Sequence, residues 1–193
     1  MVQNSRANPQ QGPFLEEQIR ECYGRVVYSH KTHERCADIL LKRQSRIKIA
    51  QIVLSAGSTV GFVSILFGSG DVGTIIGGGV SAVLLVLNGY TKDYDLGQLA
   101  QKHRQAAADL WLIRERYLSL LTDLRSNAST EDQVRIERNE LLVELHSIYV
   151  GAPSTNFKAY TQAQNALKNL EDMTFSDDEI DVFLPNSLKK SEG

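Results

Sequence analysis

The sequence has few cysteines and almost no net charge. Two cysteines, Cys22 and Cys36, are too few for a small secreted module built on disulfides. On one helix they would lie roughly 21 Å apart, whereas a disulfide joins α-carbons separated by roughly 4.4–6.8 Å. We therefore expect free thiols in a reducing compartment. A net charge of −2 supplies no broad basic field, which excludes nucleic acid held by counterion release as the main partner.

The sequence also lacks the motifs of common enzyme classes. It contains no P-loop, no nucleophile elbow, no HExxH and no dinucleotide-binding glycine motif after a strand. Its glycine triplet, 77–79, lies in an apolar segment that a phosphate would not enter. His30, His33 and Cys36 could bring two ligands near a zinc ion, but they do not complete a tetrahedral set. We predict no catalytic residues, no cofactor and no metal.

The N-terminal segment does not have the pattern of a secretory signal. Residues 1–12 are polar and contain no apolar core of the kind that such a signal needs. We expect residues 1–13 to form a disordered lead.

Charge is missing from the middle of the chain. Residues 49–91 contain one charged residue, Asp71, within the link Gly68–Asp71 that separates two apolar stretches, 49–67 and 72–90. As a helix, each stretch would be about 28 Å long, close to the roughly 30 Å of a bilayer core. The remaining amphipathic segments could hardly surround two helices that are apolar on every side. The sequence therefore predicts an all-α integral membrane protein with a hairpin of two spanning helices.

Basic residues predict the orientation of this hairpin. Residues 25–48 contain seven Lys and Arg against two acidic residues, and the link between the spans contains none. Basic flanks stay on the cytoplasmic side of a membrane. We expect both termini to be cytoplasmic, with Asp71 at the far face.

Amphipathic helices are predicted on both sides of the hairpin. Apolar residues recur every three or four positions over 14–46 and again over 92–125. Their apolar stripes can pack together as an antiparallel stalk. The residues expected at a stalk interface are Leu110, Trp111, Ile113, Tyr117 and Leu121.

Residues 130–188 are predicted to add a smaller helical extension. Ser129 or Thr130 can cap a first helix that Gly151 and Pro153 end, and residues 156–170 continue the helical pattern. A capping-box spacing at Ser176–Glu179 precedes a last helix. We expect these helices to fold back on the stalk as a cap, followed by a disordered tail at 189–193.

Polar and small residues form stripes within the two predicted spans. The polar candidates are Gln51, Ser55, Ser58, Thr59, Thr74, Ser81 and Asn88, and the glycines at GxxxG spacing are Gly57 with Gly61 and Gly73 with Gly77. Polar side chains at membrane depth need a protein partner or water, so the stripes either line a lumen or pack one hairpin together. Both interpretations stay open. The glycines likewise fit contact within a hairpin or between protomers.

The chain resembles the SLATT family, the two-transmembrane effector domains associated with bacterial SMODS and SLOG modules. The resemblance covers about residues 14–188, with a core over 14–125. The segments that carry it are YSHKTHERC at 28–36, IVLSAG at 52–57, AQKHR at 100–104, LWLIRERY at 110–117, LLTDL at 120–124, AYTQAQ at 159–164 and TFSDDEID at 174–181.

The resemblance implies an effector of bacterial antiviral defence. Such a protein would oligomerise and permeabilise the inner membrane when a partner sensor or a nucleotide signal activates it. Its partners would be the lipid bilayer, further copies of itself and a separate sensor, since this chain contains no fused sensor domain. A second interpretation is a membrane anchor or scaffold that recruits the actual effector through its cytoplasmic helices. A phage holin fits the hairpin but not the long segment after it.

Overall fold

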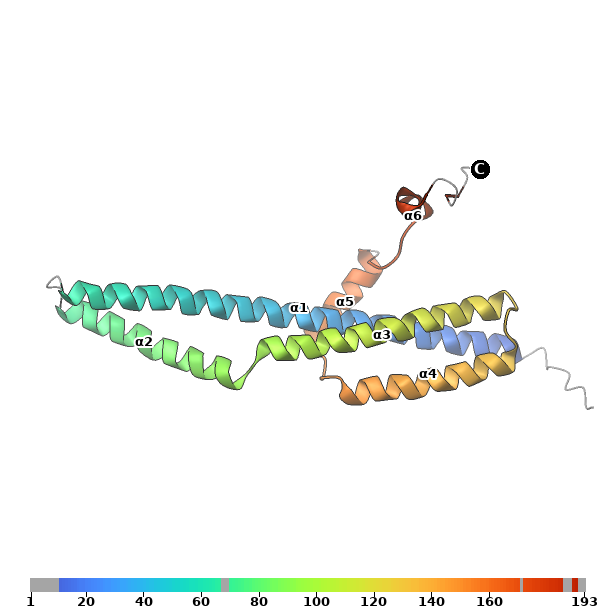
Figure 1. Cartoon of the computed structure of the whole chain (residues 1–193), viewed down its shortest axis with the longest axis horizontal. Coiled ribbons are helices and arrows are strands. Elements are labelled where there is room, and N and C mark those ends of the chain that lie inside the picture. The colour runs from blue at the N-terminus through green and yellow to red at the C-terminus, as the bar shows by residue number, and fades with distance from the viewer. Residues whose placement is uncertain (1–10, 67–69, 171, 186–188, 191–193) are drawn as a thin grey trace, which may run out of the picture.

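The computed structural model describes residues 11–66, 70–170, 172–185 and 189–190. Within these residues the fold is all-α, with no strand. The helices are α1 (Gln11–Leu66), α2 (Gly70–Asp93), α3 (Leu96–Arg125), α4 (Glu131–Gly151), α5 (Phe157–Asn169) and α6 (Asp177–Phe183). Figure 1 shows an elongated molecule in which α2 and α3 run back along α1.

Helix α1 combines the predicted stalk helix and the predicted first span. It continues for 56 residues, which is about 84 Å at 1.5 Å per residue. It begins at Gln11, before the expected start at Phe14, and includes Pro13 in its first turn. Proline is tolerated there because the first backbone N–H groups of a helix have no intrahelical partner. The stalk and the span are therefore one continuous element.

Helices α2 and α3 are separate, although the apolar pattern runs on from the second span to Leu124. Helix α2 extends to Asp93, and the side chain of Asp95 then caps α3 by accepting a hydrogen bond from the N–H of Gln98 at 2.9 Å. This cap satisfies a free N–H at the start of α3, so it favours an end to one helix and the start of another. The chain bends here, as Figure 1 shows.

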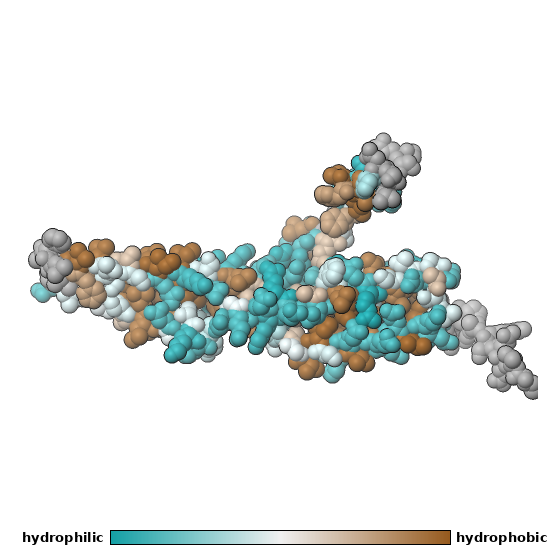
Figure 2. All heavy atoms as spheres, in the orientation of Figure 1, coloured by the Kyte–Doolittle hydropathy of each residue, from teal (hydrophilic) through white to brown (hydrophobic). Residues whose placement is uncertain are grey.

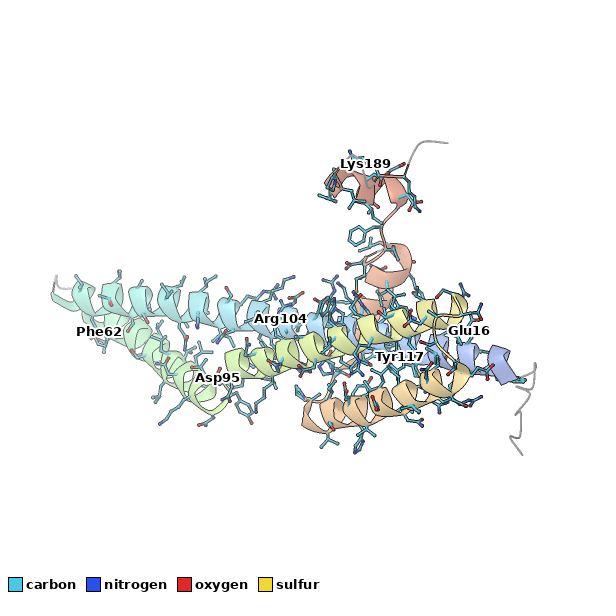
Figure 3. All side chains as sticks on the ribbon, turned by 45° about the vertical axis from the view of Figure 1, so that its right-hand side comes forward. Glu16, Phe62, Asp95, Arg104, Tyr117 and Lys189 are labelled. Atoms are coloured by element: carbon cyan, nitrogen blue, oxygen red, sulfur yellow. The ribbon has the colours of Figure 1, made fainter. Side chains whose placement is uncertain are left out.

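The apolar core of the stalk involves three helices rather than the predicted two. Tyr117 and Leu110 of α3 are fully buried together with Ile19 of α1 and Leu141 of α4. Figure 3 shows Tyr117 in this part of the bundle. Helix α4 begins as expected with Thr130, whose side chain and that of Gln133 form a capping box.

The C-terminal extension follows the prediction only in part. Helix α5 packs on α1 through three buried alanines, and Ser176 with Glu179 forms the expected capping box of α6. Helix α6 does not fold back on the stalk. None of its residues is buried, and it stands away from the bundle in Figure 1. In the expected tail, Lys190 forms an ion pair with Asp177 at 2.6 Å, while residues 1–10 and 191–193 lie outside the described part.

Candidate functional site

The outer faces of the hairpin are apolar and exposed. The large apolar side chains between 45% and 74% exposed are Ile49, Ile52, Val53, Val60, Phe62 and Val63 on α1 and Ile75, Ile76, Val83, Leu85 and Val86 on α2. Figure 2 shows hydrophobic residues toward the hairpin end and hydrophilic residues over the middle of the molecule. Water would not stabilise this arrangement, because each of these partly exposed side chains forgoes part of the roughly 1.5–3 kcal/mol that full burial supplies. A lipid environment removes that cost.

One helical stretch of the described residues meets the length and composition of a membrane span. It lies within Gly73–Arg125, and 6% of its apolar window is buried. The core helix of a soluble protein would be mostly buried, so this exposure favours lipid contact. The predicted first span, 49–67, runs into residues 64–70, whose side chains lie outside the described part.

Four of the predicted polar residues meet across the hairpin. The Gln51 Nε2 donates to Asn88 Oδ1 at 2.9 Å and to the hydroxyl of Thr91 at 3.3 Å. Further along, the Ser58 and Ser81 hydroxyls are 2.9 Å apart. These hydrogen bonds form a polar seam between α1 and α2, and each group in the seam has a partner that does not require water.

Glycines bring the two helices together beside this seam. A Cβ atom added to Gly61 would lie 3.3 Å from the Gly77 Cα and 3.4 Å from the Gly73 carbonyl oxygen. Three of the four predicted glycines therefore meet. Gly57 does not, because a Cβ added there meets nothing within 4 Å.

The remaining polar candidates of the spans are Ser55, Thr59 and Thr74, and all three are exposed. The Thr59 hydroxyl donates to the Ser55 carbonyl of its own helix at 3.0 Å. Ser55 and Thr59 are one turn apart, so they form an exposed polar strip on α1, beside the seam.

The predicted stalk residues separate into two groups. Leu110, Ile113 and Tyr117 are buried, and Leu121 packs partly buried against them. Trp111 is 48% exposed, because a residue next to a buried position turns about 100° away from it on a helix. Within one chain, Trp111 lies outside the stalk core.

Sequence reasoning missed a polar cluster inside the stalk. The Nδ1 atoms of His33 on α1 and His103 on α3 are 2.9 Å apart, and the Nδ1 of His30 lies 2.8 Å from the Ala107 carbonyl oxygen. Burial, with the charges of His103 and His30, lowers the pKa of His33 to about 4, and burial also lowers the pKa of His103. Both rings are neutral at pH 7, so one Nδ1 donates and the other accepts. The only signal in the sequence was that His33 and His103 occupy apolar stripe positions.

A buried lysine links the C-terminal segment to this region. The Nζ of Lys31 lies 2.9 Å from a Glu34 carboxylate oxygen and 2.8 Å from Asp172, and Asp172 also contacts Arg35 at 3.3 Å. Burial alone would lower the pKa of Lys31, but the hydrogen bonds to Asp172 and Glu34 outweigh it and raise that pKa. Lys31 therefore remains charged and holds Asp172, which lies between α5 and α6.

These features describe an all-α protein: a two-helix hairpin whose exposed apolar faces are compatible with lipid, continued by a helical stalk. The chain belongs to the SMODS and SLOG-associating 2TM effector domain family 4, which it matches over residues 15–179. This membership confirms the family resemblance found in the sequence. Neither a curated protein nor a solved structure matches the chain.

Proposed function

We propose that this chain is the membrane-permeabilising effector of a bacterial defence system. Several copies assemble through the hairpin and the stalk, and they breach the inner membrane when a separate sensor or a nucleotide signal activates them. Family membership supports the effector role and the association with signalling modules. The family resemblance implies membrane permeabilisation, and the exposed hairpin supports it.

The exposed polar strip on α1 is the observation that carries the proposal. Ser55 and Thr59 are exposed at membrane depth, outside the polar seam of their own hairpin. The Thr59 hydroxyl donates to the Ser55 carbonyl of its own helix, whereas the Ser55 hydroxyl has no partner among the described residues. Lipid tails offer that hydroxyl no hydrogen bond, so it needs another helix or water. Assembly of hairpins supplies either environment. We therefore assign Gln51, Ser58 and Ser81 to packing within the hairpin, and the exposed strip to the assembly.

Exposed apolar residues of the stalk support self-association. Trp111, Leu112 and Leu118 of α3 are between 45% and 53% exposed. Trp111 and Leu118 lie two turns apart on one face, and Leu118 borders a groove of about 320 Å³ that also contains Tyr23 and Leu121. A second copy of the stalk covers this surface in our proposal, with Trp111 as an anchor of the contact.

The charge distribution supports an orientation with both termini in the cytoplasm. Seven basic residues precede the first span within 25–48, and basic flanks are retained on that side. The stalk then faces the compartment in which a sensor or nucleotide signal would be produced.

Dye release from liposomes tests the proposal. The full chain is reconstituted at increasing protein-to-lipid ratio, and oligomers are followed by crosslinking in the same samples. We expect release to rise with oligomer content. Replacing the strip by Ser55→Leu with Thr59→Leu removes the polar surface and should abolish release, while the matched variant Val53→Leu with Val60→Leu, at apolar exposed positions, retains it.

Crosslinked oligomers without dye release would contradict a pore and favour the anchor or scaffold function. Release that is unchanged in the Ser55→Leu, Thr59→Leu variant would contradict our assignment of the strip.

A further inference from the structure

A basic groove lies between α1 and α5, close to the membrane end of the stalk. It has a volume of about 480 Å³. Its charged lining residues are Arg35, Asp38, Lys42, Arg43 and Arg46 from α1 and Lys158 from α5. Five cations therefore face one carboxylate, and the groove is strongly positive.

Four of these cations have no acidic partner in the part of the chain that the structure describes. Lys42, Arg43, Arg46 and Lys158 make no ion pair there, whereas Arg35 does. The single carboxylate, Asp38, is already held by Arg104 at 2.6 Å and by Arg35 at 3.6 Å. The positive charges around this groove repel one another, and one carboxylate does not offset this repulsion. A bound anion would therefore stabilise the groove.

Arg35 and Arg43 have other contacts. Arg35 also reaches Asp172 at 3.3 Å, and the Arg43 guanidinium lies over the Tyr90 ring, 5.6 Å from its centre. Tyr90 is the last residue of the predicted second span, so this cation–π contact places Arg43 at the edge of the apolar segment. The groove thus begins where the hairpin leaves the membrane.

The position along α1 points to the source of the anion. Arg46 precedes Ile49, the first residue of the uncharged segment, by about 4.5 Å along the helix axis, and Lys42 precedes it by about 10 Å. The polar layer on each side of a bilayer core is about 5–8 Å thick. Arg46 lies within this layer. Lys42, one helical turn farther out on the same face of α1, reaches it through its long side chain.

We propose that this groove binds a phosphate group, supplied by an anionic lipid headgroup of the leaflet that the stalk faces. Lys42 and Arg46 approach the phosphate from α1, and Lys158 closes it from α5, with the Gln162 amide at the same wall. A bound lipid would then tie α5 to the membrane surface. The inference rests on the membrane position of the hairpin, which the proposed function shares, but it does not require a pore.

Lipid titration of the full chain in neutral detergent tests this inference. Labelled phosphatidylglycerol is the anionic probe and phosphatidylcholine is the neutral one. We expect the wild type to prefer phosphatidylglycerol, and each cation removed from the groove to weaken that preference about fivefold. The test variant is Lys42→Gln, Arg46→Gln, Lys158→Gln. Its matched control, Arg20→Gln, Lys102→Gln, Lys168→Gln, removes the same charge from exposed sites outside the groove.

Two further arms separate the alternatives. The single substitution Lys158→Gln lies far from the spans in the sequence and leaves their insertion unchanged. A loss of phosphatidylglycerol preference in this variant therefore arises in the groove. Circular dichroism checks that helical content is kept. Inorganic pyrophosphate is the soluble phosphate source. Equal preference in the test and control variants would overturn the site, and tight pyrophosphate binding without a phosphatidylglycerol preference would overturn the lipid source. Loss of dye release with an intact lipid preference would contradict only the proposed function.

Discussion

His33 of α1 and His103 of α3 face each other inside the stalk, with their Nδ1 atoms 2.9 Å apart. Both side chains are about 3% exposed. Because two protonated rings could not share this contact, the pair couples the packing of α1 against α3 to pH.

Acid should destabilise the stalk. The pKa of His33 is lowered from 6.5 to about 4, so between these values the unfolded chain binds more protons than the folded one. Stability then falls as the pH drops from about 6.5 toward 4, by up to about 1.4 kcal/mol per pH unit for each such histidine. Thermal unfolding at pH 5 and pH 7, followed by circular dichroism in detergent, measures this slope.

Two histidine variants test whether this dependence of stability on pH arises from the His33–His103 pair. His33→Asn with His103→Asn keeps groups that can hydrogen-bond and should flatten the slope, whereas His146→Asn, on α4, should leave it unchanged. A slope that survives in the double variant would assign the acid sensitivity to other groups.

Close contact of the two spans should make Gly61 intolerant of side chains. In Gly61→Val, the added Cβ would lie 3.3 Å from the backbone of Gly77, which cannot move aside as a flexible side chain would. We expect a loss of about 1–3 kcal/mol in hairpin stability, the usual cost of overpacking. Crosslinking between Ser58→Cys and Ser81→Cys reports the contact and should become slower. Gly57→Val, where a Cβ meets nothing within 4 Å, is the control and should crosslink at the wild-type rate.

Two leucines of α3 should differ sharply in their effect on the stalk. Leu110 is fully buried and Leu112 is 53% exposed. Leu110→Ala leaves a cavity between α1 and α3 and should lower the free energy of unfolding by about 2–5 kcal/mol. Leu112→Ala should change it by less than about 0.5 kcal/mol in the isolated chain. Denaturant unfolding in detergent compares them, and equal losses would refute the stalk core described above.

Asp172 should hold the C-terminal segment on the stalk. In Asp172→Asn the buried Lys31 keeps Glu34 but loses its second carboxylate, and Arg35 loses a partner. Leaving a buried cation underpaired costs about 1–3 kcal/mol, so the segment after α5 should detach more often. Limited proteolysis would then cut between α5 and α6 faster. Asp178→Asn, on exposed α6, should not change the cleavage rate.

The elements that could be predicted from the sequence are those specified by local patterns. The uncharged stretch around Asp71 predicted two apolar helices, and the capping residues Thr130 and Ser176 marked two helix starts correctly. The boundary between the second span and the next helix was expected at residues 90–92 but lies at Asp95, where the side chain accepts a hydrogen bond from the N–H of Gln98.

The sequence by itself determined the helices, their apolar stripes and the membrane character of the hairpin, because composition and periodicity act within a few turns of one chain segment. Only the tertiary structure decided which polar groups meet. It brought Ser58 to Ser81 and Gly61 to Gly77, left Ser55 exposed, and placed Lys158 across the groove from Lys42. These choices depend on the rotation and crossing of packed helices, where a shift of one residue turns a side chain by about 100°.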